Sequence, residues 1–569
     1  MDLTAKAAEL RHRIIDVCAQ NGGHIGASLG AVELTLALHE EFETPRDSLV
    51  WDVGHQSYAH KLLTGRDADF GSLRKKGGIS GFTSRDESEH DVFGAGHSST
   101  SISAALGIAE AKRLRGDDSW TVAVIGDGGL TAGLAFEALN QAGACAEPRL
   151  LVIVNDNNLS ISANVGALDR WAFGAEREPR KFFESLGFAY EGPLDGHDIE
   201  AMRAELRKVK AEPLGRVRVV HVLTKKGKGF APAENEPVKF HGVGPFDKLT
   251  GKAESKPGAA TYSQVFGREL ARLACSDKSI VAITAAMSEG TGLVGFAKEH
   301  PDRFYDVGIA EPHALVFAAG LATQRLKPVV AIYSTFLQRA VDSVIHDIAL
   351  QKLDVVLAVD RAGLVGADGP THHGLFDIPI LRGIPGVAIG APSCAEDLAL
   401  MLQAAFGEPG LKAVRYPRGT APSAGSPFKP TAWGRARVAT TGTDQLVAVW
   451  ALGTAFGWAE KALAALDAKA RKRITLVDAR FAKPIDVETL ASTLAGAHAL
   501  LTLEDGAVAG GFGSALVEAA LVGNIALPPR VRLLGVPDRF IKHAEVEEQR
   551  EDAGVSLPQL VSVLEELLK

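Results

Sequence analysis

The sequence has little of what several large classes of protein require. It contains only four cysteines and no C-x-x-C pair, so we expect neither a disulfide framework nor a zinc site. It has no uncharged apolar stretch long enough to span a bilayer, and its first residues lack the basic-then-apolar pattern of a signal peptide. Low-complexity tracts and short-period repeats are absent too. We therefore expect a cytoplasmic protein without a membrane partner.

An excess of positive charge is also missing. The net charge of −8 over 569 residues argues against nucleic acid or an anionic membrane as a partner. Any basic site must then be local, and we expect it to bind a small anion. The composition is 46% apolar and rich in glycine and alanine, which favours α/β layers over a β-sandwich.

The chain is too long for one hydrophobic core and suggests about three domains. Residues 251–260 and 420–430, which are polar or rich in small residues and contain proline, are typical of linkers. Short apolar runs that predict buried strands alternate with helical spacing in each third. We predict three doubly wound α/β domains, at residues 1–257, 258–424 and 425–569.

Two polar turns of the first domain follow predicted buried strands. The turn 126–129, Gly-Asp-Gly-Gly, follows the apolar run 121–125, and the turn 155–158, Asn-Asp-Asn-Asn, follows the run 150–154. Helical spacing lies between them, so both turns belong at the carboxyl ends of parallel strands, where such sheets bind ligands. Either turn alone is weak evidence, because these residues are common in turns. The pair favours a ligand site.

The chemistry of the two turns points to a metal ion and a diphosphate. Asp127 offers a carboxylate and Asn157 an amide oxygen. Magnesium prefers a few such hard oxygens and shares its other positions with substrate phosphates. Gly128 and Gly129 let the backbone approach a diphosphate closely.

A second candidate site begins at Glu311. The strand-like run 303–307 leads into Gly-Ile-Ala-Glu-Pro-His at 308–313 and then into a predicted helix. Pro312 suits an early helical position, because its missing N–H is not needed there. Glu311 belongs at the positive end of the helix dipole, where an acidic residue is stabilising in any protein. This segment alone does not distinguish a catalytic glutamate from a structural one.

Together these segments resemble the thiamine-diphosphate enzymes, in which one domain holds the diphosphate through magnesium and another holds the pyrimidine with a glutamate. The resemblance is close to the 1-deoxy-D-xylulose-5-phosphate synthase family. It implies a thiamine-diphosphate-binding fold in each of the first two domains and a transketolase C-terminal-like fold in the third. The third domain has few chemically reactive residues in suggestive places, and we expect it to have a structural role. It covers nearly the whole chain in the expected order and is carried by residues 23–24, 53–58, 96–103, 124–133, 155–160, 308–320, 333–339, 361–372 and 416–419.

The resemblance implies an activity and its cofactors. The family condenses pyruvate with D-glyceraldehyde 3-phosphate, releasing carbon dioxide, and uses thiamine diphosphate and Mg²⁺. The product is 1-deoxy-D-xylulose 5-phosphate, a precursor of isoprenoids, thiamine and pyridoxal. In this family both cofactor sites come from one chain, and we expect a homodimer.

The resemblance also assigns cofactor-binding residues. The Mg²⁺ ligands match Asp127, Asn157 and the backbone oxygen of Leu159. Glu311 matches the glutamate that hydrogen-bonds the pyrimidine ring nitrogen, and Phe336 matches the aromatic ring that stacks on the pyrimidine. The lysines of the turn 225–228 could equally form a solvated basic turn. The remaining cofactor pocket matches His55, Gly96, His97, Ser98, Gly128, Gly129, Lys226 and Phe230.

Proton transfer and substrate binding are assigned in the same way. Alongside Glu311, the family's catalytic histidines match His24, His55, His241 and His372, and a near-neutral pKa suits imidazoles to proton transfer. A lone histidine is more often only a hydrogen-bonded polar residue. The acceptor's phosphate calls for arginine, and sequence leaves open whether Arg415 or Arg418 binds it. The acceptor site matches Tyr333, Arg339, Arg361, Asp368, His372 and Arg418.

The sequence departs from the family in three places. The stretch between residues 164–166 and 182–183 looks shorter than the family's loop, and the amino terminus also looks shorter. A shortened loop, whether natural or engineered, bears on gating more than on chemistry. Pro312 replaces the more usual polar residue after the glutamate.

Three alternatives remain open at this stage. A transketolase would use ketose phosphate donors without releasing carbon dioxide. The decarboxylating component of a 2-oxoacid dehydrogenase would need a lipoyl partner. A regulatory homologue would bind the cofactor without turnover.

Overall fold

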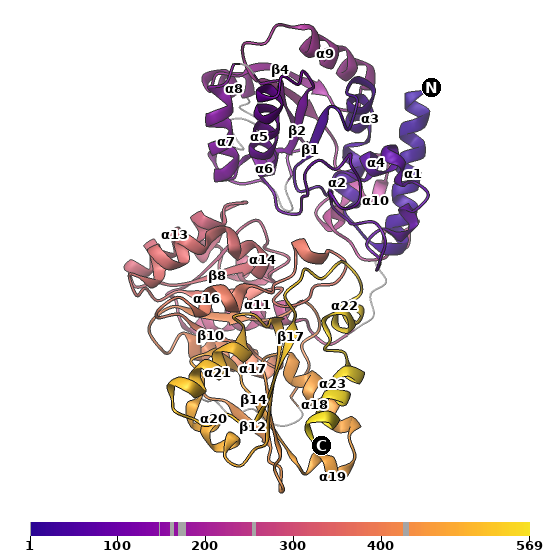
Figure 1. Cartoon of the computed structure of the whole chain (residues 1–569). Coiled ribbons are helices and arrows are strands. Elements are labelled where there is room, and N and C mark those ends of the chain that lie inside the picture. The colour runs from indigo at the N-terminus through magenta and orange to yellow at the C-terminus, as the bar shows by residue number, and fades with distance from the viewer. Residues whose placement is uncertain (1, 147, 160–163, 169–177, 253–257, 425–431) are drawn as a thin grey trace. The chain divides into compact units, whose positions relative to one another are not determined.

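The computed structural model describes residues 2–146, 148–159, 164–168, 178–252, 258–424 and 432–569. The chain forms two compact units (Figure 1). The first unit comprises residues 1–256 and 308–310, and the second comprises residues 257–307 and 311–569. The predicted linkers at 251–260 and 420–430 lie partly outside the described residues.

The first unit is built on a five-stranded sheet in which every neighbouring pair is parallel, in the order β1-β2-β3-β5-β4. The strands are β1 (Ser48–Trp51), β2 (Thr121–Gly126), β3 (Leu150–Asp156), β4 (Ala189–Asp195) and β5 (Arg218–Leu223). The helical elements are α1 (Leu3–Asn21), α2 (Ile25–Gly30), α3 (Val32–Glu41), α4 (Tyr58–Lys61), η1 (Leu62–Arg66), η2 (Phe70–Ser72), α5 (Ser101–Leu114), α6 (Asp127–Leu130), α7 (Gly133–Gly143), α8 (Pro179–Ser185), α9 (Ile199–Ala211), α10 (Ala231–Asn235) and η4 (Lys239–His241).

Helices cover both faces of this sheet, as Figure 1 shows. Successive side chains of a strand point to opposite faces. In β2, Val122 and Val124 therefore pack against α1, α2, α3 and α9, whereas Ala123 and Ile125 pack against α5, α7 and α8. A strand buried on both faces reads as a continuous apolar run. This explains why the apolar runs 121–125 and 150–154 correctly predicted the strands β2 and β3.

One helix begins later than its spacing suggests. The helical pattern starts near the metal turn, but α7 begins at Gly133, because Ala132 before it has an extended backbone with φ −79° and ψ 150°. The turn itself forms the separate one-turn helix α6, with Asp127 as its first residue. The candidate metal ligand thus lies between a strand end and a helix start.

The second unit contains two sheets. The first has the order β15-β10-β11-β9-β8-β6-β7 and is parallel except for the edge strand β15. The second has the order β12-β14-β13-β16-β17 and is parallel except for the edge strand β12. Their strands are β6 (Ile280–Thr284), β7 (Phe304–Asp306), β8 (Lys327–Tyr333), β9 (Val356–Asp360), β10 (Ala388–Gly390), β11 (Lys412–Arg415), β12 (Arg437–Thr440), β13 (Val447–Ala451), β14 (Ile474–Asp478), β15 (Phe481–Lys483), β16 (Ala499–Ala507) and β17 (Arg530–Val536).

The two sheets of the second unit share one hydrophobic core. Val330 of β8 and Leu357 of β9 belong to the same buried cluster as Trp450 of β13 and Val477 of β14. The strand β15 also crosses the predicted boundary at residue 424, because it pairs with β10. The predicted α/β class is confirmed, whereas the three-domain division remains a prediction. The helical elements are α11 (Tyr262–Ser276), α12 (Val294–Glu299), η5 (Pro301–Arg303), α13 (Glu311–Thr323), α14 (Ser334–Leu337), η6 (Gln338–Ala340), α15 (Val341–Ser343), η7 (Val344–Ala349), η8 (Gly369–Thr371), α16 (Asp377–Arg382), α17 (Ala395–Ala405), α18 (Ala455–Ala465), α19 (Ala468–Arg471), α20 (Val487–Leu494), α21 (Phe512–Val522), α22 (Val546–Ala553) and α23 (Leu557–Leu567).

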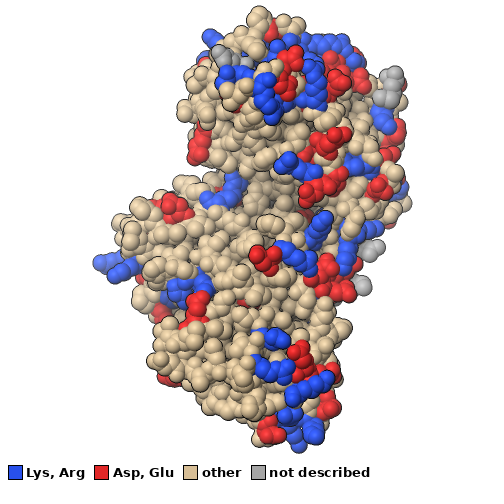
Figure 2. Space-filling view, viewed as in Figure 1, with Lys and Arg blue, Asp and Glu red and all other residues tan. Residues whose placement is uncertain are grey.

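The surface carries charges of both signs. On the face drawn in Figure 2, basic and acidic side chains lie intermixed. In the described part of the chain, no helix combines the length and the apolar character needed to cross a membrane. All four cysteines are free thiols.

The end of α7 depends on a close glycine contact. A Cβ added to Gly143 would lie 1.9 Å from the backbone oxygen of Leu186, and one added to Gly187 would lie 2.4 Å from the oxygen of Gly143. Gly133, at the other end of α7, has open space around its Cβ position. We expect Gly143→Ala to lower the free energy of unfolding by about 1–3 kcal/mol through overpacking. The control Gly133→Ala should leave it unchanged or raise it by about 0.4–1 kcal/mol. Chemical denaturation measures both, and equal effects would contradict this account.

Candidate active site

The candidate residues of the first unit follow the carboxyl ends of its parallel strands. Asp52 follows β1, Asp127 follows β2, Asn157 follows β3 and Lys226 lies three residues after β5. The register pairs Gly126 with the first asparagine of the turn 155–158, which brings the ends of β2 and β3 together. The strand–helix–strand arrangement predicted for the metal turns is therefore present.

Asp127 lies in a buried polar setting at this edge. Its side chain is about 1% exposed, and Asn164 Nδ2 donates a hydrogen bond to its Oδ2 at 2.6 Å. Burial raises the pKa of Asp127 to about 7, and the nearby charge of Asp156 adds to the shift. Asn157 Oδ1 accepts the Leu159 N–H at 3.2 Å. A carboxylate and an amide oxygen on adjoining strand ends fit the hard-oxygen set that Mg²⁺ prefers.

Asp52 holds the backbone directly after residues 96–98, the segment that the resemblance assigns to the cofactor pocket. Its two carboxylate oxygens accept the N–H groups of Ser99 at 2.7 Å and of Ser101 at 3.1 Å. Ser99 Oγ in turn donates to the backbone oxygen of Gly129 at 2.7 Å. The segment with Gly96, His97 and Ser98 is thereby tied to the metal turn.

Gly129 has little room for a side chain beside Asp52. A Cβ at this position would lie 3.0 Å from Asp52 Oδ1, so a larger residue would have to displace the Asp52 side chain slightly. Sequence reasoning missed the role of Asp52. The sequence feature that could have indicated this role is the position of Asp52, an acidic residue directly after the apolar run that forms β1.

The two lysines of the turn 225–226 differ in their surroundings. Lys226 is about 5% exposed, whereas Lys225 is exposed and forms an ion pair with Glu234 at 2.5 Å. Burial lowers the pKa of Lys226 to about 8, and the charge of Asp127 partly offsets this. A solvated basic turn therefore describes Lys225 but not Lys226.

Three of the four predicted histidines lie together in the first unit. The ring centroid of His24 lies 6.0 Å from that of His55 and 6.0 Å from that of His241, and the centroids of His55 and His241 are 5.2 Å apart. Burial lowers the pKa of His55 to about 3, and the charge of Lys226 lowers it further. Burial and the same lysine also lower the pKa of His241, whose Nδ1 lies 3.2 Å from Lys226 Nζ. His55 and His241 are therefore neutral imidazoles, each with one ring nitrogen that can donate a hydrogen bond and one that can accept.

Phe230 lies in an aromatic cluster close to the same turn. Its ring centroid is 5.7 Å from that of Phe240 and 5.8 Å from that of Phe246. Its N–H donates to the oxygen of Gly227 at 3.0 Å, which ties the cluster to the lysine turn. Its proposed contact with the cofactor remains a prediction.

In the second unit, Glu311 is a buried carboxylate at the start of α13. Its residue is about 4% exposed, and among the described residues its Oε2 has no hydrogen-bond partner. Arg339 Nε lies 3.6 Å from this oxygen. Burial raises the pKa of Glu311, and the charge of Arg339 only partly offsets the shift. A buried carboxyl oxygen without a hydrogen bond is suited to a ring nitrogen as its hydrogen-bond partner.

Aromatic and basic side chains follow β8 and β9. The rings of Tyr333 and Phe336 stack at 5.5 Å with an interplanar angle of 8°. The Arg361 guanidinium lies 4.2 Å from the centroid of Tyr333, and His372 meets the Phe336 ring edge-on at 5.7 Å. Four of the predicted site residues are therefore linked by successive contacts between their side chains.

The three candidate arginines have different partners. Arg361 Nη1 donates to Ser263 Oγ at 2.9 Å and to the oxygen of Gly290 at 2.6 Å. Arg415 is buried, and it donates to Asp377 Oδ2 at 2.8 Å. The Arg418 side chain is 52% exposed and lies 3.6 Å from Asp368 Oδ2.

The C-terminal part of the chain braces the segment that carries Arg361, Asp368 and His372. Asp505 Oδ1 accepts the Leu364 N–H at 3.1 Å, and Gln549 exchanges two hydrogen bonds with the backbone of Gly366 at 2.9 and 2.8 Å. Sequence reasoning assigned this part a general structural role and missed these contacts. The Gln549 contact spans 183 positions, and no local pattern indicates it.

Comparison with known proteins places this geometry in a family. The family model described as transketolase, pyrimidine binding domain, matches residues 258–423, and transketolase, C-terminal domain, matches residues 434–560. These matches define the transketolase class. The model of the N-terminal domain, described as 1-deoxy-D-xylulose-5-phosphate synthase, matches residues 1–176 and 172–224.

Curated relatives are similar over the full chain. The protein named 1-deoxy-D-xylulose-5-phosphate synthase from Thiobacillus denitrificans is 48% identical over 100% of this chain and 96% of its own length. Those from Nitratidesulfovibrio vulgaris and Heliobacterium modesticaldum are 48% and 46% identical, over 100% of this chain and 94% and 93% of theirs. Among solved structures, transketolase from Leishmania mexicana is 18% identical, covering 100% of this chain and 97% of that one, with a TM-score of 0.47. The chain belongs to the 1-deoxy-D-xylulose-5-phosphate synthase family.

The comparisons also bear on the expected shortened loop. The alignment with the Thiobacillus denitrificans protein spans 605 positions, at least 36 more than the 569 residues of this chain (605 − 569). The N-terminal family model matches in two ranges that overlap at residues 172–176. This overlap lies inside the stretch that we expect to be shorter than in the family. Residues 169–177 themselves lie outside the described part of the chain.

The raised pKa of Glu311 predicts how stability changes with pH. The folded protein binds the Glu311 proton more tightly than the unfolded chain does, so ionisation destabilises the fold as pH rises above the ordinary value of 4.5. We expect cofactor-free Glu311→Gln to be more stable than the wild-type protein near neutral pH. Below pH 4.5 the difference should vanish. Denaturation of both proteins across this range tests the effect, and a variant that is less stable at neutral pH would contradict it.

Proposed function

We propose that this protein catalyses the thiamine-diphosphate-dependent condensation of pyruvate with D-glyceraldehyde 3-phosphate, giving 1-deoxy-D-xylulose 5-phosphate and carbon dioxide. One observation carries the proposal: the chain combines buried Asp127 and Lys226, at the strand ends of the first unit, with Glu311, a buried carboxyl of raised pKa whose Oε2 has no hydrogen-bond partner among the described residues. Thiamine diphosphate has a diphosphate at one end and an aminopyrimidine at the other. When bound, it supplies the carbanion and the electron sink.

The first unit holds the charged end of the cofactor. In this proposal Asp127, Asn157 and the backbone oxygen of Leu159 coordinate Mg²⁺. The backbone groups of the glycine turn and the charge of Lys226 neutralise the diphosphate, as oriented N–H groups and buried cations do elsewhere. Phe230 lines the cofactor from its aromatic cluster. The remaining diphosphate contacts come from His55, Gly96, His97, Ser98, Gly128 and Gly129.

Glu311 holds the aminopyrimidine. The raised pKa of Glu311 favours its protonated form, which can donate a hydrogen bond to the ring nitrogen of the pyrimidine. Phe336 stacks on the ring. Both contacts orient the heterocycle, which is the protein's share of the chemistry in a cofactor enzyme.

The histidines handle protons and the arginines handle phosphate. His24, His55 and His241 lie together in the first unit, with His55 and His241 held neutral by burial, and His372 supplies a fourth imidazole in the second unit. Arg418 is the residue that we assign to the acceptor's phosphate, because Arg415 is buried against Asp377. Tyr333, Arg339, Arg361 and Asp368 complete the acceptor site.

The wider setting of the enzyme follows from the same proposal. We infer a cytoplasmic homodimer with domains at residues 1–257, 258–424 and 425–569, the last of them bracing the acceptor site. Neither nucleic acid nor a membrane takes part. The product serves the synthesis of isoprenoids, thiamine and pyridoxal, and the short stretch around residues 164–183 alters gating rather than chemistry.

The decisive experiment is a donor and acceptor assay. Purified protein with Mg²⁺ and thiamine diphosphate should release carbon dioxide from pyruvate and form 1-deoxy-D-xylulose 5-phosphate when glyceraldehyde 3-phosphate is added. Glu311→Ala should lower turnover at least about a hundredfold, as loss of a transition-state contact does.

Its controls separate the alternatives. Omitting thiamine diphosphate should abolish the reaction, and xylulose 5-phosphate should not replace pyruvate as donor. Efficient use of xylulose 5-phosphate would indicate a transketolase. A requirement for a lipoyl partner would indicate a dehydrogenase component, and tight cofactor binding without turnover would indicate a regulatory homologue.

A further inference from the structure

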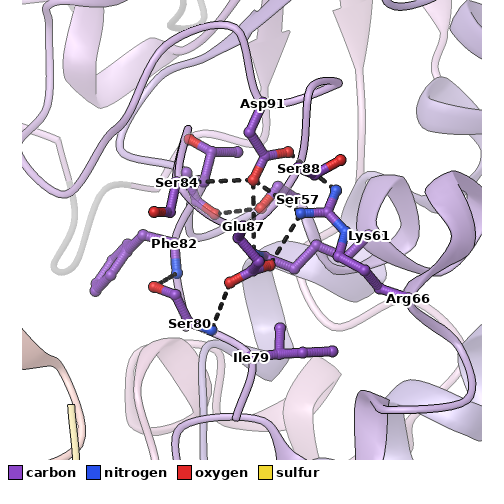
Figure 3. A network of polar contacts seen from close by, with 12 residues as sticks. Ser57, Lys61, Arg66, Ile79, Ser80, Phe82, Ser84, Glu87, Ser88 and Asp91 are labelled. Atoms are coloured by element: carbon purple, nitrogen blue, oxygen red, sulfur yellow. Dashed lines mark hydrogen bonds and ion pairs between the residues drawn. The ribbon is translucent and has the colours of Figure 1, made fainter. Parts of the chain in front are cut away.

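A buried network of charged side chains joins the helical segment after His55 to the loop at residues 79–95 (Figure 3). We call it the loop network. Its members share direct ion-pair or hydrogen-bond contacts, and all are buried except Glu87, which is partly buried. They are His60, Lys61, Arg66, Glu87 and Asp91. The first three come from α4 and η1, and the two acids come from the loop.

The basic members bind both acids. Lys61 Nζ contacts Glu87 Oε1 directly and lies 3.8 Å from Asp91 Oδ2. Arg66 Nη1 lies 2.9 Å from Glu87 Oε1 and 2.8 Å from Asp91 Oδ2. His60 Nε2 lies 3.1 Å from Asp91 Oδ1. The loop is therefore fixed to α4 and η1 by charge-assisted contacts.

The two acids also hold the loop's own backbone. Glu87 Oε2 accepts the Ser80 N–H at 2.8 Å, and Asp91 Oδ2 accepts the Ser84 N–H at 2.9 Å. Residues 79–95 contain no regular helix or strand. These side chains therefore replace the backbone hydrogen bonds that a helix or strand would supply.

Stability alone does not explain such a network. The Lys61 side chain is fully buried, and burial lowers its pKa although the charges of Glu87 and Asp91 oppose the shift. Replacing a buried ion pair with apolar residues is often neutral or stabilising, because desolvating the charges offsets their attraction. Buried pairs are better attested as devices that fix one geometry among several.

The loop carries groups that meet the candidate cofactor site. The Phe82 ring lies 5.0 Å from the ring of His24. Thr83 packs closely against Gly54, the residue before His55, since a Cβ added to Gly54 would lie 2.9 Å from Thr83 N. The backbone oxygen of Thr83 also accepts the Ala95 N–H at 3.1 Å. The chain then continues directly into the segment 96–98. A displaced loop would move both the wall of the histidine cluster and the diphosphate segment.

We propose that Lys61 and Glu87 are positioning residues, whose ion pair holds the loop 79–95 against His24 and the segment 96–98 and thereby sets the affinity for the cofactor. The inference rests on the proposed function, because the affinity concerned is that for thiamine diphosphate. Neither residue is among those assigned to catalysis or to cofactor and substrate binding.

The test is a calorimetric titration of the cofactor-free protein with thiamine diphosphate at saturating Mg²⁺. Glu87→Gln keeps the shape of the side chain but removes its charge, and we expect it to raise the Kd at least about tenfold. At saturating cofactor its kcat should stay within about threefold of wild type, because the reacting groups are intact. Glu87→Asp keeps the charge and should restore much of the affinity.

The matched control is Glu41→Gln. Like Glu87, Glu41 is a partly buried carboxylate of the first unit, and it binds Arg203 at 2.9 Å and Arg207 at 2.8 Å, on α9 and not on the loop. It should lower the thermal midpoint as Glu87→Gln does, yet leave the Kd within about twofold of wild type. The double variant Lys61→Met with Glu87→Gln avoids an unpaired buried lysine and should also raise the Kd.

Two results would overturn the inference. One is a wild-type Kd in Glu87→Gln or, if that variant does not fold, in the double variant. The other is an equal rise of the Kd in Glu87→Gln and Glu41→Gln. A wild-type protein that binds no thiamine diphosphate would overturn the proposed function itself, and this inference with it.

Discussion

The candidate site depends on one constraint, the shared direction of parallel strands. Parallel pairing brings the carboxyl ends of neighbouring strands to one edge of a sheet, so polar residues far apart in sequence meet there. In the first unit the ends of β1, β2, β3 and β5 contribute Asp52, Asp127, Asn157 and Lys226. In the second unit the ends of β8, β9 and β11 contribute Tyr333, Arg361 and Arg418. Reversing one central strand would scatter these groups.

The same constraint decides what the sequence could predict. Asp127 and Asn157 were predictable because each directly follows a doubly buried strand, and both the apolar run and the polar turn are local features. Glu311 was recognised as a helix-start residue, but only the structure shows that it is buried and that its Oε2 has no hydrogen bond within the described part of the chain. The assignment of the acceptor's phosphate to Arg418 rather than Arg415 also needed the structure, because only the structure shows that Arg415 is buried and Arg418 exposed. Asp52, Gln549 and the loop network escaped prediction because their partners lie from 21 to 183 positions away.

Buried charge takes two opposite forms in this protein. Burial raises the pKa of Asp127 and of Glu311, since neither has enough opposing charge beside it. Burial alone would raise the pKa of Asp91 as well, but hydrogen bonds from His60 and Arg66 and the charge of Lys61 hold it below its usual range. A raised pKa does not by itself mark a ligand site, because burial also raises the pKa of Asp505, which holds the backbone of Leu364.

The central proposal is that Lys226 and Glu311 both bind thiamine diphosphate. Titration of the cofactor-free protein with thiamine diphosphate at saturating Mg²⁺ tests it most directly. We expect one equivalent bound per chain, a Kd at least about tenfold higher in Lys226→Met from the loss of a charge-assisted contact, and little change in the exposed neighbour Lys225→Met. Glu311→Gln should also weaken binding. Equal affinities in the two lysine variants, with wild-type binding in Glu311→Gln, would contradict the claim.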